Sequence, residues 1–167
     1  MIIRDEAAGD DAAIRAVNLA AFETDTEARL VDLLRVTASP VISLVAEVAG
    51  DVVGHIMFSP VVVDGCGDLL LLGLAPMAVS PAYQRQGIGS ALVRAGLDAC
   101  RTLGACAVVV LGHPAYYPRF GFRPASELGL ACEYDVPAGF FMARALGPGH
   151  LEGVRGTVRY HRAFGEV

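Results

Sequence analysis

An apolar run from Leu69 to Val79 constrains the fold more than any other segment of the chain. It spans eleven residues and is interrupted only by Gly73 and Pro76. A strand that is apolar on both faces belongs at the centre of a sheet covered on both sides. Proline cannot donate to a β-ladder, so we expect a bulge or a splay near Ala75–Met77. The run is too short to cross a bilayer, so we expect no transmembrane segment and no membrane partner.

The segments around this run alternate between extended and helical patterns, which predicts a mixed α/β sheet with helices on both faces, in a single domain over residues 1–167. Gly50-Asp51 separates two β-branched runs and predicts a hairpin turn. We expect strands over 2–5, 41–48, 52–63, 69–79, 105–111, 140–146 and 156–161. We expect helices after Asp10 or Asp11 (with Ile14, Val17, Leu19 and Ala21), before Pro40 (with Leu30, Leu33, Leu34 and Val36 on one face) and over 86–103.

Composition and charge exclude several classes of protein. Of the 167 residues, 54% are apolar and 19% charged, which is typical of a folded chain and not of a disordered one. The net charge is −5 with 13 basic residues and no basic block, so we expect no nucleic-acid partner. The first residues lack the pattern of a signal peptide. The cysteines form no C-x-x-C pair and no zinc spacing, which indicates reduced thiols, a cytoplasmic location and no metal.

The polar segment that follows the apolar run, Ser80 to Ser90, places glycines at the start of a helix. The first N–H groups of a helix are free and carry partial positive charge, and glycine lets a phosphate approach them, so the segment favours a phosphate cradle. It lacks the lysine of a P-loop, and Leu92 stands where a Rossmann fingerprint has its third glycine. A third pattern, [QR]-x-x-G-x-[GA], is matched by Gln84, Gly87 and Gly89.

The stretch from Gln84 to Gly89 resembles the acetyl-CoA signature of the GCN5-related N-acetyltransferases (GNAT). Over nearly its whole length the chain is similar to a bacterial subgroup of small predicted N-acetyltransferases, although His113 stands where that subgroup has Asp or Asn. The resemblance implies a mostly antiparallel sheet flanked by helices and splayed at the fourth and fifth strands, with the pantetheine arm in the splay. It also implies acetyl-CoA as donor and leaves a homodimer open. The implied cofactor contacts are Met77, Ala78, Val79, Gln84, Arg85, Gln86, Gly87, Ile88, Gly89 and Ser90.

Aromatic residues crowd the segment from Leu111 to Phe122, and most of them are expected to be packing residues. In the GNAT family a tyrosine precedes a Gly-Phe pair by four residues, and Tyr117 stands four before Gly121. The resemblance implies that its hydroxyl lies near the thioester sulfur and protonates or orients the leaving thiolate. A phenol with a pKa of about 10 can donate to a thiolate. The alternative is a tyrosine that packs on the cofactor arm without proton transfer.

The acceptor side is less defined, because the acidic residue that many relatives carry on the fourth strand is missing from 69–79. Glu23, Asp25 and Glu27 form an acidic loop that either attracts a cationic amine or is only solvated. His55 is either a base or a satisfied core histidine. We expect direct acetyl transfer to the primary amine of a small molecule or peptide, with Glu23, Glu27 and His55 as candidate acceptor contacts. A CoA-binding module or sensor without turnover is the alternative; a longer acyl group and a non-amine acceptor also remain open.

Overall fold

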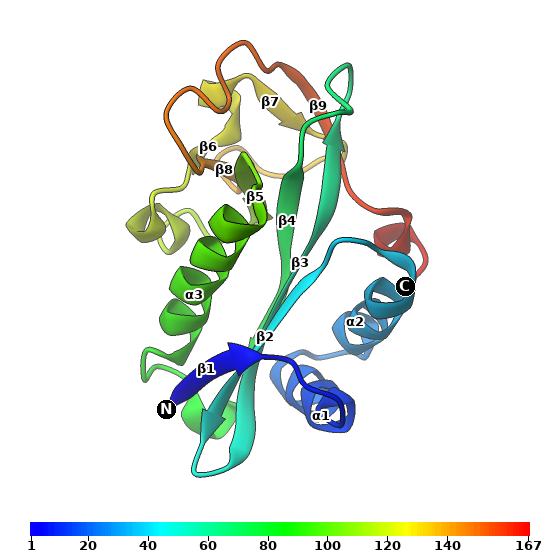
Figure 1. The fold of residues 1–167 in the computed structure, drawn as a ribbon, viewed down its shortest axis with the longest axis vertical. Coiled ribbons are helices and arrows are strands. Elements are labelled where there is room, and N and C mark those ends of the chain that lie inside the picture. Colours follow the sequence, from blue (N-terminus) through cyan, green and yellow to red (C-terminus); the bar gives the residue numbers. More distant parts are fainter. The chain divides into compact units, whose positions relative to one another are not determined.

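The computed structural model describes residues 1–167, and Figure 1 shows its helices and strands. These residues divide into two compact units. The first unit contains residues 1–59, 75–96 and 162–167. The second contains residues 60–74 and 97–161. Two long strands, β3 (Asp51–Val63) and β4 (Leu71–Val79), contribute residues to both.

The predicted mixed sheet, mostly antiparallel and flanked by helices, is confirmed. Its strands follow the hydrogen-bonded order β1-β2-β3-β4-β5-β8-β6, and β9 pairs with both β3 and β7. The helices are α1 (Asp11–Ala21), α2 (Thr26–Thr37) and α3 (Ile88–Leu103). The other strands are β1 (Ile2–Asp5), β2 (Ile42–Val48), β5 (Ala107–Leu111), β6 (Arg123–Pro124), β7 (Leu130–Cys132), β8 (Phe141–Ala145) and β9 (Gly156–Arg159).

In the first unit, helices cover both faces of the β2–β3 hairpin because alternate strand residues point to opposite sides. A Cβ built on Gly54 would lie 3.1 Å from the side chains of Ile88 and Leu92, so the start of α3 packs on that face. His55 and Met57 of β3 point the other way, toward α1 and α2. The core on that side consists of Ile14, Leu30, Val31, Leu34, Ala38, Val45, Met57 and Ala163.

In the second unit, β5 pairs in parallel with β4 and antiparallel with β8. The parallel register covers Leu71–Gly73 of β4 and Ala107–Val109 of β5, which agrees with the splay expected between these strands. β4 stays extended through Pro76, and the Ala75–Pro76 peptide bond is cis. The core of this unit consists of Val61, Val63, Leu71, Ala107, Val109, Ala125, Leu130, Phe141, Ala143, Leu151, Val154 and Val158.

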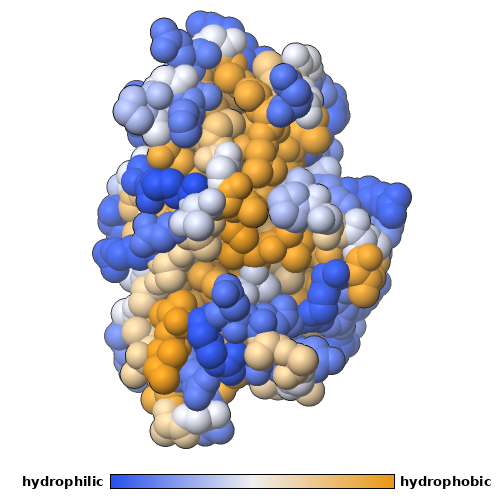
Figure 2. All heavy atoms as spheres, viewed as in Figure 1, coloured by the Kyte–Doolittle hydropathy of each residue, from blue (hydrophilic) through white to orange (hydrophobic).

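Two helix predictions need correction. The predicted helix over 86–103 begins at Ile88, because Arg85 (φ 62°) and Gly87 (φ 86°) hold the backbone in the left-handed region. Leu19 and Val36 were expected to pack inward, but they are 44% and 77% exposed. The surface over α1 and α2 accordingly mixes hydrophilic areas with smaller hydrophobic ones (Figure 2).

Other boundaries differ in ways that periodicity does not resolve. Asp10 precedes α1, but its carboxylate accepts hydrogen bonds from Arg4 and from the Ala7 N–H and does not cap the helix. The final strand ends at Arg159 instead of residue 161. β6 and β7, of two and three residues, were not predicted because so short a strand shows no alternation. None of the helices is long and apolar enough to span a membrane.

Candidate active site

The segment Ser80–Ser90, here called the glycine loop, joins the end of β4 to α3 within the first unit. Gln84, Arg85, Gln86 and Gly87 are exposed, whereas Ile88 is 4% exposed and packs over the hairpin. The first backbone hydrogen bond of α3 runs from the Ala91 N–H to the Gly87 carbonyl, at 3.0 Å. The N–H groups of Ile88 and Gly89, at the start of the helix, therefore have no acceptor within the helix.

Side-chain amides brace the glycine loop from within. Gln84 donates from Nε2 to the Val79 carbonyl at 2.9 Å, and Gln86 donates from Nε2 to the Ala82 carbonyl at 3.3 Å. The Ser80 N–H donates to the Val53 carbonyl at 2.8 Å, which ties the end of β4 to β3. The two glutamine amides thus bond to backbone carbonyls. The groups of the loop that remain for a ligand are N–H groups at the helix start, where partial positive charge favours an anion.

The predicted strand contacts lie directly before the glycine loop. Met77 and Val79 are half-buried, and Ala78 between them is 3% exposed. Their alternation follows from the strand, in which neighbouring side chains point to opposite faces. The structure thus brings Met77, Ala78 and Val79 together with Gln84–Ser90 in one unit.

The segment Leu111–Phe122, here called the aromatic turn, belongs to the second unit and contains Tyr117. Tyr117 begins a short 3-10 helix, Tyr117–Phe120, which ends at Gly121 in the left-handed conformation (φ 88°). Its ring lies edge-on to Tyr116 and Phe122, with centroids 5.1 and 5.7 Å away. Tyr117 is 8% exposed, and its burial, with a smaller contribution from Tyr116, raises the pKa of its phenol to about 12.

His113, which departs from the subgroup's Asp or Asn, serves the turn itself. Its Nδ1 accepts a hydrogen bond from the Ala115 N–H at 3.1 Å. Asp and Asn accept a bond from the backbone two residues on in the same way. Its ring lies edge-on to Phe140, at 5.9 Å. The imidazole therefore takes over the backbone contact that a shorter Asx side chain would make.

His55 is fully buried and belongs to a small polar network on the α1 side of β3. Its Nδ1 is 3.3 Å from Asn18 Nδ2, and its Nε2 is 2.9 Å from Ser43 Oγ. The Asn18 amide can only donate at that nitrogen, so Nδ1 accepts and the proton sits on Nε2, facing Ser43. Burial, together with the charge of Arg35, lowers the pKa of His55 to about 3. A side chain with no exposed surface offers no contact to an acceptor, so the structure supports the core interpretation.

The predicted acidic residues lie where α1 turns into α2. Glu23 is exposed in the connection, and Glu27 is half-buried in the first turn of α2. Asp25 lies 3.9 Å from Arg29, a distance at which an exposed pair contributes little. The two glutamates share the unit of the glycine loop, and Tyr117 lies in the other.

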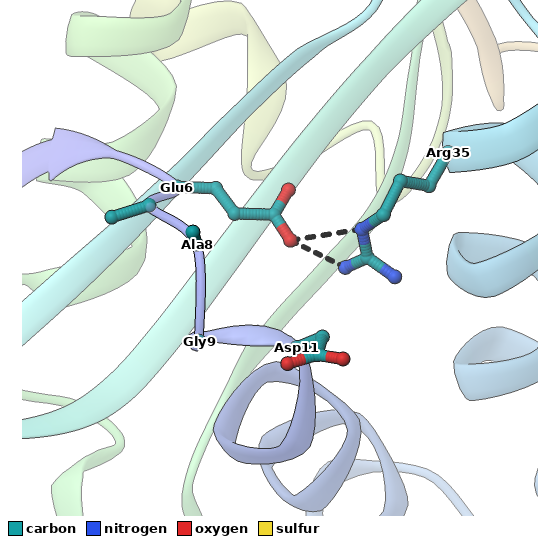
Figure 3. A pocket seen from close by; sticks show the side chains of 6 residues that line it. Glu6, Ala8, Gly9, Asp11 and Arg35 are labelled. Carbon is teal, nitrogen blue, oxygen red and sulfur yellow. Dashed lines mark hydrogen bonds and ion pairs between the residues drawn. The ribbon is translucent and has the colours of Figure 1, made fainter.

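A surface hollow of about 390 Å³ lies elsewhere in the first unit and contains none of the predicted site residues (Figure 3). It is lined by Glu6, Ala7, Ala8, Gly9, Asp11 and Arg35. One carboxylate oxygen of Glu6 accepts from Nε and Nη2 of Arg35, at 2.9 and 2.5 Å. The Arg35 guanidinium is thus already paired with the carboxylate of Glu6, and the lining of the hollow suggests no chemistry of its own.

The structure contains no candidate metal site and no disulfide bond. No three His, Cys, Asp or Glu side chains are grouped so that they could hold a metal ion. The four cysteines are free. Burial raises the pKa of Cys100 to about 12, so its thiol stays protonated and unreactive.

The fold, with its parallel β4–β5 pair and a glycine loop between β4 and α3, is that of an acyl-CoA-dependent acyltransferase. A family model described as "Acetyltransferase (GNAT) domain" matches residues 40–124. The chain is 42% identical over 165 residues to the "Uncharacterized N-acetyltransferase YhbS" of Escherichia coli K12, with 98% of each protein covered. The chain belongs to the GNAT acetyltransferase family.

Two solved structures are similar along almost all of this chain. The crystal structure of YhbS from Escherichia coli in complex with CoA has a TM-score of 0.92 and 40% identity, covering 98% of this chain and 91% of that one. A GNAT family acetyltransferase from Brucella melitensis in complex with acetyl-CoA has a TM-score of 0.79 and 40% identity, covering 98% and 97%. Residues from both compact units are therefore matched in each relative.

Proposed function

We propose that this chain transfers the acetyl group of acetyl-CoA directly to a primary amine, with residues 1–167 acting as one N-acetyltransferase domain. The observation that carries the proposal is the 40% identity, over 98% of this chain, to a GNAT acetyltransferase that was solved with acetyl-CoA. The local geometry supports the proposal, because this single chain contains both the glycine loop at the start of α3 and a buried Tyr117.

The glycine loop is the proposed site for the pyrophosphate of acetyl-CoA. The backbone N–H groups from Arg85 to Ser90 provide the donors, and the start of α3 adds partial positive charge. The amide of Gln84 acts by holding the loop to Val79. Met77, Ala78 and Val79 are proposed to contact the pantetheine arm, with N–H groups near Val79 stabilising the oxyanion of the tetrahedral intermediate.

Tyr117 is the proposed catalytic residue at the thioester sulfur. Its pKa of about 12 keeps the phenol protonated at every pH at which the enzyme would work. The pKa of a thiol is about 8.5, roughly three to four units below the pKa of Tyr117, so full transfer of the Tyr117 proton to the thiolate is unfavourable. We therefore propose that Tyr117 stabilises the departing thiolate by donating a hydrogen bond, and that solvent supplies the proton.

The acceptor must lose a proton before it attacks, and no side chain of β4 can take it. His55 is unsuited to that role, since its conjugate acid (pKa about 3) is far more acidic than an ammonium group of pKa about 10. Glu23 and Glu27 are proposed to attract a cationic acceptor, a small amine or a peptide, and water is proposed to carry its proton away. The free thiols agree with a cytoplasmic location.

Thermal unfolding with and without acetyl-CoA tests the donor site. At 100 times its dissociation constant the ligand should add about 2.7 kcal/mol of stability, and ATP and NAD serve as controls. Release of CoA thiol over a panel of amines then tests the transfer. Stabilisation without turnover on any amine would favour the CoA-binding module, and equal stabilisation by ATP would contradict the acetyl-CoA site. Sedimentation of the same sample tests for a homodimer.

A further inference from the structure

Gly112 occupies a fixed place at the end of β5, beside the aromatic turn. Its N–H donates to the Phe140 carbonyl at 2.9 Å, continuing the pairing of Leu111 with Phe141. It is not among the glycines with positive φ, so its backbone conformation is open to any residue. Backbone freedom therefore does not explain a glycine here.

The space beside Gly112 is filled by the ring of Tyr117. A Cβ built on Gly112 would overlap Cε2 of that ring and would lie 2.6 Å from Cδ2 and 3.2 Å from Cζ. These atoms belong to a rigid ring, which must move as a whole to relieve the overlap. The ring of Tyr117 thus packs against the backbone of Gly112, in the space that a Cβ would occupy.

The ring has little room to retreat. Tyr116 and Phe122 lie edge-on to it, and Phe120 follows at a centroid distance of 6.4 Å. The side chain is 8% exposed, so a displaced ring must push aside other aromatic rings or turn toward solvent. Either movement shifts the hydroxyl at the far end of the ring.

We propose that Gly112 is a positioning residue for Tyr117: by lacking a Cβ, it sets where the Tyr117 hydroxyl lies. Gly112 itself touches neither donor nor acceptor in this role. The inference rests on the proposed function in one respect, that the Tyr117 hydroxyl acts at the sulfur. The placement of the ring can be tested without any activity.

The first test compares Gly112→Ala with Gly67→Ala, an exposed glycine whose added Cβ meets nothing within 4 Å and whose φ is not positive. Misplacing a reacting group by about 1 Å can cost about 100-fold in rate. We expect Gly112→Ala to lower kcat by about that factor with KM for acetyl-CoA nearly unchanged, and Gly67→Ala to keep kcat. Ultraviolet titration should show the Tyr117 phenol ionising at lower pH in Gly112→Ala. Wild-type kcat in Gly112→Ala would overturn the proposal.

Two double-mutant cycles separate positioning from general damage. In a Tyr117→Phe background, Gly112→Ala should lower kcat no further, because the hydroxyl is already gone. In a Tyr117→Ala background, Gly112→Ala should cost no stability, because the ring it would strike is absent. An equal stability loss in both the wild-type and Tyr117→Ala backgrounds would overturn the proposal.

The cycles also keep the proposal separate from the proposed function. If Gly112→Ala fails to fold, folding of the Gly112→Ala/Tyr117→Ala double variant supports the steric coupling, and failure of both variants overturns it. Full activity of Tyr117→Phe would contradict the catalytic role of the hydroxyl. The stability cycle and the titration would still decide whether Gly112 places the ring.

Discussion

The glycine loop and the aromatic turn both depend on glycine, but for opposite reasons. At Gly87 the backbone needs a positive φ, and an added Cβ would meet nothing within 4 Å. At Gly112 the backbone is ordinary, and an added Cβ would strike Tyr117. The loop is shaped by dihedral angles and leaves residues 84–87 exposed, whereas the turn is shaped by packed rings. One candidate site is built from the backbone and the other from side chains.

The largest effect is expected when the Tyr117 hydroxyl is removed. Tyr117→Phe keeps the ring and its packing, so affinity for acetyl-CoA should be unchanged while kcat falls by about 10²–10³-fold, the loss expected when one hydrogen-bond donor to a developing negative charge is removed. Steady-state kinetics measures both. The adjacent Tyr116→Phe is the matched control and should retain kcat within a few-fold; equal losses in the two variants would assign the effect to the turn as a whole.

Gly96→Ala asks whether crowding sets the cost of a substitution outside the aromatic turn. Gly96 lies within α3, and a Cβ there would lie 2.5 Å from Cζ of Phe58, which is fully buried. Overpacking typically costs 1–3 kcal/mol, and the better helix propensity of alanine offsets about 1 kcal/mol of this cost, so we expect a net loss centred on ~1 kcal/mol. Denaturant unfolding measures it, and Phe58→Leu should restore part of the loss. A stability equal to that of the wild type would show that crowding is a poor guide.

Gly87→Ala tests the glycine loop, and Gly104, which has the same backbone conformation, provides the control. Gly87 and Gly104 both have positive φ and open space around them, so alanine at either should cost about 1 kcal/mol of stability. Only Gly87 lies in the glycine loop, so only Gly87→Ala should weaken acetyl-CoA binding in a calorimetric titration. Equal affinities for the two variants would remove the loop from the donor site.

The buried Tyr117 ring adds its own pH dependence to the stability of the protein, and this effect is absent near neutral pH. Burial raises the pKa of Tyr117 from 10 to about 12, so between these pH values the unfolded chain releases a proton that the folded chain keeps. Stability is therefore lost as pH rises through this window, by up to about 1.4 kcal/mol per pH unit from this group. Urea unfolding of wild type and Tyr117→Phe should show the steeper fall in wild type. Parallel curves would mean that the ring is more solvated than its burial indicates.

The two regions also differ in how far sequence reasoning reaches them. Glycines at a helix start form a local pattern, so Gln84–Gly89 could be singled out from the sequence, as could the position of Tyr117 relative to Gly121. The start of α3 at Ile88 could not, because the positive φ of Arg85 is unusual for a residue that is not glycine.

Long-range packing was out of reach of the sequence. Nothing near Gly112 in the chain indicates that a ring five residues later fills its place. The partners of buried His55, on β2 and α1, are 12 and 37 residues away along the chain. A histidine among apolar residues is compatible with a base as well as with a core residue. Asn18 was missed for the same reason, since a single polar residue on a helix carries no sign of what it will face.

A site made of backbone donors recognises only what it touches. The N–H groups of the glycine loop would bind the diphosphate, which acetyl-CoA and CoA share, and they have no means of sensing whether the sulfur still carries an acetyl group. Free CoA should therefore occupy the donor site nearly as well as acetyl-CoA. Competitive product inhibition follows, so the rate would respond to the ratio of acetyl-CoA to CoA and not to the amount of acetyl-CoA alone.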